Sequence, residues 1–313
     1  MNNSTMTEIC PSEVNFFFVY LNAILHIIFG LINFIFNLLM LIAIYGKPTK
    51  NNIDKYSLMY ASGASLLTVN MVWEYSRAIW YVTNDELVSS LHCMYVTPYS
   101  SLYSIADIAI AEALFFMALD FLISLAEQSK MMTKWNKVKI LSMGTISLAS
   151  NVTDVAFCWK SAMTNVKWIS IMCVYSTILP EEYFMPHYIV TSSIGIGALV
   201  LLFSSVFLLL TKKSVCTGIR EVQIKRQTIV MKKLLTISFF TLISQTLPHS
   251  LIVYIYISKC TADWISFVWL GQIIIIPLYP VIRFLEDRSL IKGLKVVLPF
   301  HSDSNFVGTS HQN

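Results

Sequence analysis

A few polar side chains lie within long apolar stretches of this chain, where they could recognise a ligand. Tyr99, Tyr103 and Asp107 recur every four residues, so on a helix they share one face. His249 follows Gln245 by one helical turn. Ionisable groups at bilayer depth cost several kcal/mol unless they face protein or water, so each is a candidate functional residue.

The same side chains also allow a purely structural interpretation. Asp107 and His249 could hydrogen-bond or ion-pair with each other and simply hold two helices together. Among the other ionisable residues, Glu112 is expected to cap a neighbouring helix or stay protonated. Asp154 is expected to reach the lipid headgroups. His26 is expected to be a core residue.

The elements that must position these groups are seven apolar stretches, each at least about 20 residues long. Such a stretch can cross about 30 Å of hydrocarbon as an α-helix. The stretches lack the alternation of a membrane β-barrel, and the bilayer requires each backbone to satisfy its own hydrogen bonds. The sequence therefore predicts an all-α bundle of seven transmembrane helices. The predicted spans are Phe16–Tyr45, Tyr56–Tyr81, Leu91–Leu125, Val138–Trp159, Tyr183–Leu210, Ile229–Ile257 and Ala262–Phe284.

The distribution of positive charge predicts the orientation of the bundle. Most of the 22 lysines and arginines fall between spans one and two, three and four, five and six, and after span seven. The positive-inside rule places these segments in the cytoplasm and the N-terminus outside. We expect an extracellular segment at 1–15, a transmembrane domain at 16–284, and a cytoplasmic amphipathic helix with a polar tail at 285–313. Asn2 and Asn3 begin glycosylation sequons in the outer segment.

Four of the six cysteines fall on the predicted outer side, where they face an oxidising compartment. They are Cys10, Cys93, Cys173 and Cys260. The sequence does not give their connectivity. We favour a disulfide between Cys93 and Cys173, which would hold the longest outer loop across the mouth of the bundle, and a pair of Cys10 with Cys260 stays open.

Prolines mark candidate hinges in the last two spans. Pro248 lies in span six, and Pro277 and Pro280 lie in span seven. Each removes a backbone hydrogen bond and can kink its helix, which would let the bundle switch between two packings. The alternative is that prolines are simply commoner in membrane helices than in soluble ones.

The order of these features resembles the rhodopsin-like G-protein-coupled receptors, and most closely the serpentine chemoreceptor families of nematodes. Asn37 is similar to the asparagine of span one in that family. Asp120 looks like the acid of its Asp-Arg-Tyr region, with Phe121 in place of the arginine. Tyr279-Pro280 lies where the family has Asn-Pro-x-x-Tyr. Cys93 and Cys173 lie where its outer disulfide lies.

The resemblance implies a chemosensory receptor in the plasma membrane, such as that of a sensory cilium, that couples to a heterotrimeric G protein. Its ligand would be a small molecule or a short peptide. The implied ligand pocket consists of Tyr99, Tyr103, Asp107, Gln245, His249, Trp269 and Gln272. The implied G-protein-facing residues are Asp120, Phe121, Lys225, Arg226, Lys232 and Lys233.

Other functions predict features that the sequence does not display. A transporter or ligand-gated channel is the alternative, but no internal repeat or pair of broken helices in matching halves is evident. The chain has no His-Glu-x-x-His motif, so we do not expect an enzyme. We expect no metal, no cofactor and no nucleic-acid partner.

Overall fold

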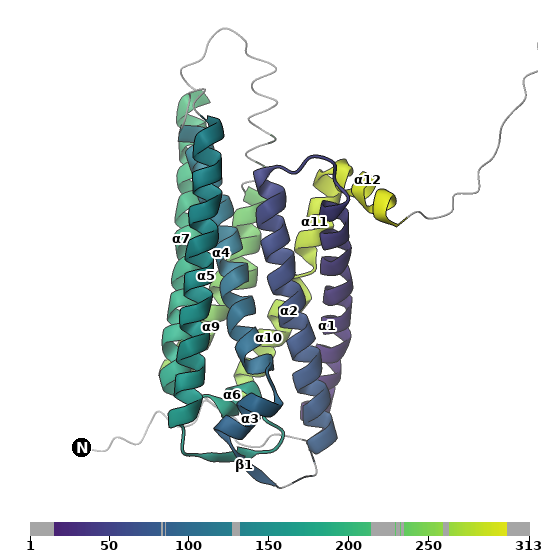
Figure 1. Ribbon diagram of the computed structural model, residues 1–313, viewed down its shortest axis with the longest axis vertical. Coiled ribbons are helices and arrows are strands. Elements are labelled where there is room, and N and C mark those ends of the chain that lie inside the picture. The colour runs from purple at the N-terminus through teal and green to yellow at the C-terminus, as the bar shows by residue number, and fades with distance from the viewer. Residues whose placement is uncertain are drawn as a thin grey trace, which may run out of the picture.

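Long helices that run side by side make up most of the chain (Figure 1). The structure is a computed structural model, and it describes residues 16–82, 86–126, 132–213, 235–258 and 263–298, together with positions 84, 229 and 232. The long helices are α1 Phe16–Tyr45, α2 Asn52–Tyr81, α4 Tyr99–Ala126, α5 Met132–Thr164, α7 Glu181–Lys213 and a helix over Leu235–Ile257. The shorter helices are α3 Ser90–Val96, α6 Tyr175–Ile178, α10 Asp263–Ile275, α11 Leu278–Glu286 and α12 Arg288–Val297.

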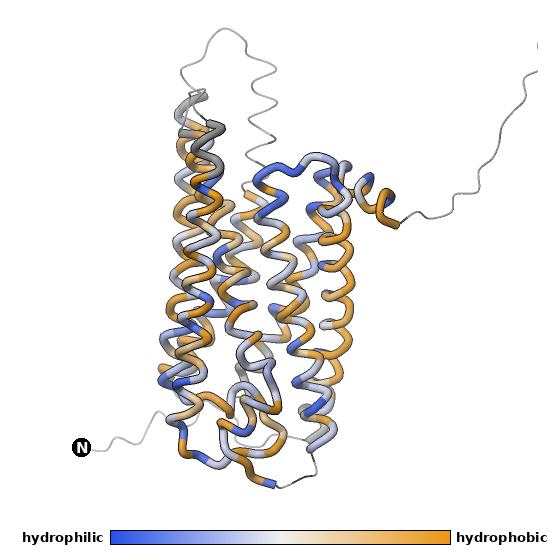
Figure 2. Tube along the Cα trace, viewed as in Figure 1, coloured by the Kyte–Doolittle hydropathy of each residue, from blue (hydrophilic) through white to orange (hydrophobic). Residues whose placement is uncertain are grey.

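Within the described residues, six helices are long and apolar enough by length and composition to cross a membrane. Figure 2 shows hydrophobic residues along their length. The outer face of α1 exposes large apolar side chains such as Ile24, Ile28 and Leu31, as contact with lipid requires. The all-α architecture of a multi-pass membrane protein therefore agrees with the prediction. The six segments are Tyr20–Tyr45, Tyr99–Leu125, Val138–Thr164, Glu181–Thr211, Leu235–Ile257 and Val268–Glu286.

The remaining predicted span, Tyr56–Tyr81, lies in α2, which is as long as α1 but less apolar. Helix α2 packs between α1 and α4 and buries Thr68, Asn70 and Glu74. These three polar side chains thus face protein and not the surface. The seven-span count depends on this helix and stays a prediction.

Two predicted spans are interrupted. The third, Leu91–Leu125, was expected to be continuous, but the chain leaves helical geometry at Thr97 and Pro98 and divides into α3 and α4. A proline has no N–H to donate and disfavours helical geometry in the residue before it. The seventh is divided into α10 and α11 at Pro277, as its proline predicts.

The sixth predicted span contains a π-helical turn, which is wider than an α-helical turn, where a proline kink was expected. Residues Leu242–Thr246 form a π-helical turn, η1, and the backbone N–H of Leu247 bonds to the carbonyl of Leu242. Helix α9, Leu247–Ile257, follows, with Pro248 in its first turn. Such turns inside α-helices are frequent at functional sites.

One end of the bundle is closed by a small cap, which we call the disulfide end. Strand β1, Leu87–Ser89, pairs antiparallel with strand β2, Trp168–Ser170. The structure contains the disulfide between Cys93 of α3 and Cys173. Figure 1 places β1, α3 and α6 together at this end and α12 at the opposite end.

At the α12 end, buried charges connect the turn after α1 to the start of α12. Lys47 Nζ lies 2.8 Å from Asp54 Oδ2 and 2.9 Å from Asp287 Oδ2, and Arg283 donates to Asp54 at 3.4 Å. Burial alone would raise the pKa of Asp287, but hydrogen bonds from Ser289 and Lys47 outweigh it and lower that pKa to about 2. The amphipathic helix predicted after span seven is α12, and it is fixed to the bundle by ion pairs.

A glycine pair sets the distance between α12 and the end of α1. A Cβ on Gly293 would collide with the carbonyl oxygen of Ala43, and a Cβ on Gly46 would collide with the carbonyl oxygen of Gly293. Only residues without a side chain allow this close approach.

Candidate functional site

The segment Ile171–Ser176, which we call the strap, lies across the disulfide end of the bundle. Its Cys173 is bonded to α3 and adopts a φ of 53°, which is uncommon for a residue other than glycine. The hydroxyl of Tyr99 donates to the carbonyl of Cys173, and Arg77 donates to the carbonyl of Ile171 at 3.0 Å. The strap is therefore held by α2 and α4 as well as by the disulfide.

A buried carboxylate forms the central contact beneath the strap. Glu74 of α2 is 6% exposed, and its two oxygens accept different hydrogen bonds. The Tyr103 hydroxyl donates to Oε2 at 2.7 Å, and the backbone N–H of Tyr175 in the strap donates to Oε1 at 2.6 Å. Glu74 thus connects the strap to α4.

A small cavity of about 40 Å³ lies directly below this contact. Aromatic side chains from α2, α4, α7, α9 and α10 line most of it, with Glu74 among them. The cavity has room for about two water molecules, so it is too small for a larger ligand in this conformation. The residues that line it are Met71, Glu74, Tyr75, Tyr103, Val174, Tyr175, Ser176, Phe184, Tyr188, Tyr256 and Trp269.

A second polar layer lies one helical turn further along α4. His187 of α7 is buried between two carboxylates, with Nε2 at 3.5 Å from Asp107 Oδ2 and Nδ1 at 3.0 Å from Asp154 Oδ2. The Tyr183 hydroxyl donates to Asp154 at 3.0 Å and also contacts the Ser104 hydroxyl. This network, which we call the histidine clamp, joins α4, α5 and α7.

The histidine clamp corrects two expectations. Asp107 pairs with His187 and not with His249, because α7 lies next to α4 at this depth. Asp154 does not reach toward headgroups: the rotation of α5 directs it inward, where its side chain is 13% exposed. Glu112 was expected to cap a helix or stay protonated; it accepts a 2.5 Å hydrogen bond from the Ser150 hydroxyl of α5 and caps no helix among the described residues, and the second alternative stays a prediction. His26 is fully buried and stacks on Tyr75, as a core residue would.

A third group lies beside the clamp on the broken helices. Gln245 in η1 bonds to His249 Nδ1 at 3.0 Å, and the His249 ring lies 6.0 Å from the Trp269 ring. Tyr188 contacts both rings, at 5.5 and 5.9 Å. Gln272 is fully buried, and neither of its amide atoms has a hydrogen-bond partner among the described residues.

The predicted pocket residues therefore gather in one half of the bundle without surrounding one cavity. Tyr103 and Trp269 line the cavity, and Tyr99 holds the strap. Asp107, Gln245, His249 and Gln272 lie in the deeper groups. Sequence reasoning missed Glu74, Tyr175 and His187. The sequence could have indicated Glu74 and His187, since each is an ionisable residue within a predicted span.

The residues predicted to face a G protein are only partly described. Asp120 forms an ion pair with Lys139 of α5, and the Asn52 amide lies 3.5 Å from its carboxylate. Phe121 is partly buried against the core, and Lys232 is exposed. Other predicted positions lie outside the described residues, namely Asn2, Asn3, Cys10, Lys225, Arg226, Lys233 and Cys260.

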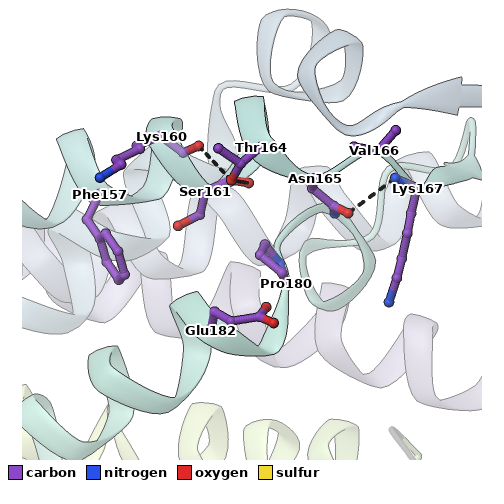
Figure 3. Close-up of a pocket in the computed structure, with 9 residues that line it drawn as sticks. All are labelled: Phe157, Lys160, Ser161, Thr164, Asn165, Val166, Lys167, Pro180 and Glu182. Carbon is purple, nitrogen blue, oxygen red and sulfur yellow. Dashed lines mark hydrogen bonds between the residues drawn. The ribbon is translucent and has the colours of Figure 1, made fainter.

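A larger pocket of about 620 Å³ opens on the surface of the disulfide end, between the end of α5 and the start of α7 (Figure 3). Figure 3 shows Lys160 and Lys167 on opposite sides of it, with Glu182 between them. These side chains are exposed, and none of the predicted pocket residues lines it. The cavity beneath the strap, in contrast, contains a buried carboxylate and two of the predicted pocket residues, so we take it as the candidate site.

No family model matches the chain, and no curated protein matches it. In the described part of the chain, no group of three or more histidine, cysteine or acidic side chains could hold a metal ion. The function must therefore be argued from the site itself.

Proposed function

We propose that this chain is a G-protein-coupled receptor of the seven-span type, with a small extracellular ligand that binds beneath the strap. The observation that carries the proposal is the small aromatic cavity with a buried carboxylate, covered by a disulfide-tethered segment. Small-molecule sites are mostly apolar with a few well-placed polar groups, and in helix bundles they lie between the helices.

The broken helices supply a route from the cavity to the other end of the bundle. Trp269 and His249 lie on α10 and α9, next to η1 and Pro248. Beyond the break at Pro277, Tyr279 packs 4.3 Å from the Tyr60 ring. A ligand that prefers one arrangement of these segments shifts the population of the bundle toward it.

The charge distribution supports the orientation that such a receptor needs. The protein would lie in the plasma membrane. By the positive-inside rule, the basic segments and α12 would face the cytoplasm, and the strap would face the cell exterior. Asp120 and Phe121 would then lie at the face that contacts the heterotrimeric G protein. A chemosensory role is the finer proposal and depends on the family resemblance alone.

A ligand screen on cells that express the chain together with a promiscuous G protein tests this function. Any active compound is then applied to the Tyr103→Ala and Trp269→Ala variants, with surface expression measured in parallel. We expect both variants to respond more weakly, because they remove side chains that line the cavity. A response that is undiminished in both variants would show that the proposed pocket is wrong.

A further inference from the structure

We infer that the cavity beneath the strap binds an organic cation, and that the cation competes with the strap for Glu74. The inference depends on the proposed function only in taking this cavity as the ligand site. It assigns the chemical class of the ligand, a small protonated amine or quaternary ammonium group, from the groups that line the cavity.

The first argument is the unbalanced charge of Glu74. Among the described residues, no lysine, arginine or histidine nitrogen lies within 4.0 Å of its carboxylate. Its two hydrogen bonds come from Tyr103 and from the Tyr175 backbone, and neither donor carries a positive charge. A buried carboxylate is costly unless it is paired, and a bound cation would pair it.

The second argument is the aromatic lining. The Tyr103 and Tyr175 rings lie 4.7 Å apart, Phe184 lies 5.1 Å from Tyr175, and Tyr188 lies 5.9 Å from Trp269. Aromatic faces attract cations, and cages of such rings are the usual recognition site for ammonium groups with methyl substituents. A neutral apolar ligand would use the rings but leave the carboxylate unpaired.

The third argument is the position of the strap. The cavity of about 40 Å³ is smaller than a trimethylammonium group with a substituent, so the ligand cannot enter unless a wall moves. The strap forms one wall, and its Tyr175 N–H contributes one of the two hydrogen bonds to Glu74. A protonated amine would donate to Glu74 in place of that N–H, whereas a quaternary ammonium group, which has no N–H, would pair with the carboxylate through its charge alone. Binding of either cation therefore competes with the contact between Tyr175 and Glu74.

Calorimetric titration of the purified full-length protein in detergent tests this inference. The probes are choline and tetramethylammonium, with dimethylbutanol as the uncharged analogue of choline. We expect at least one of the two cations to bind, and dimethylbutanol to bind at least about tenfold more weakly than choline, since only the cation can pair with the Glu74 charge and interact with the faces of the aromatic rings. Equal binding of choline and dimethylbutanol, or no binding of either cation, would overturn the inference.

Substitution of the carboxylate sharpens the test. Glu74→Gln keeps the shape and removes the charge, so cation affinity should fall at least about tenfold. Glu112→Gln is the matched control, since Glu112 is also a buried glutamate but contacts Ser150 on α5. Glu112→Gln should bind the cations as the unmodified protein does. Cation binding that Glu74→Gln leaves unchanged would refute the assignment.

The inference stays testable even if Glu74→Gln does not fold. The comparison of choline with dimethylbutanol on the unmodified protein then still decides whether the cavity prefers a cation, and Glu74→Asp, which keeps the charge, should bind the cations.

The titration also separates the ligand class from the proposed function, because it contains no G protein. Cation binding without G-protein activation would therefore refute the proposed function and leave the ligand class standing, and activation by an uncharged ligand would do the reverse.

Discussion

Two buried carboxylates at the disulfide end, Glu74 and Asp107, have different roles because their hydrogen-bond partners differ. Glu74 has two uncharged donors, whereas Asp107 shares an imidazole with Asp154. The first arrangement leaves a charge that a ligand can pair. The second pairs two carboxylates with one histidine and joins three helices, so at the residue scale we assign Glu74 to recognition and His187 to stability.

Replacement of His187 by phenylalanine tests the stabilising role. Phenylalanine keeps the ring but leaves Asp107 and Asp154 buried without their shared partner. Removal of one member of a buried ionic group costs about 3–5 kcal/mol, so we expect a marked fall in the midpoint of thermal unfolding in detergent. The measurement is the unfolding midpoint of the purified variant.

His26→Phe is the control for this experiment. His26 is also fully buried and stacks on an aromatic ring, but it faces no carboxylate among the described residues. Its substitution should lower the midpoint by much less. Equal losses in the two variants would mean that ring packing, and not charge, is the contribution of His187.

At the element scale, the attachment of α12 depends on the absence of two side chains. Gly293→Ala places a methyl group against the carbonyl of Ala43 at the end of α1. Overpacking costs about 1–3 kcal/mol, so we expect α12 to separate from α1 and its amides to exchange faster with solvent. Gly271→Ala is the matched control, because nothing lies within 4 Å of the added Cβ there. Unchanged exchange in Gly293→Ala would contradict the predicted close packing.

The charge of Asp287 makes the attachment of α12 to the bundle depend on pH. Its pKa is lowered from 3.8 to about 2, so docking of α12 favours the ionised form. This stabilisation is fully present above pH 3.8 and is lost as the pH falls toward 2. Hydrogen exchange of α12 should therefore increase on acidification in this window relative to the rest of the bundle. Asp287→Asn should show the increased exchange already at neutral pH, and exchange identical to the unmodified protein would exclude this role.

The helices themselves were largely predictable because hydropathy is a local property. The first predicted span coincides with α1, and the break at Pro277 follows from its proline. The division of the third span was missed because Pro98 can also be accommodated in a first helical turn. The direction of Asp154 could not be predicted, since it depends on how α5 is rotated against α4 and α7, and that rotation is set by packing between distant segments.

At the scale of the whole molecule, both the cavity and its strap require one orientation. A ligand can reach the strap from outside only if the disulfide end is extracellular, and the disulfide itself forms in an oxidising compartment. The basic residues near the α12 end, among them Lys47 and Lys139, favour the same orientation by the positive-inside rule. Both arguments favour the orientation that we propose, with the α12 end in the cytoplasm.

An epitope tag at each terminus of the full chain tests this orientation in intact cells. Antibody should reach the N-terminal tag before permeabilisation and the C-terminal tag only afterwards, because an odd number of spans puts the termini on opposite sides. The paired tags also test the contribution of α2. If both tags are reached only after permeabilisation, the number of spans is even and the less apolar α2 does not cross. If only the C-terminal tag is reached from outside, the strap faces the cytoplasm, and an extracellular ligand could not reach Glu74.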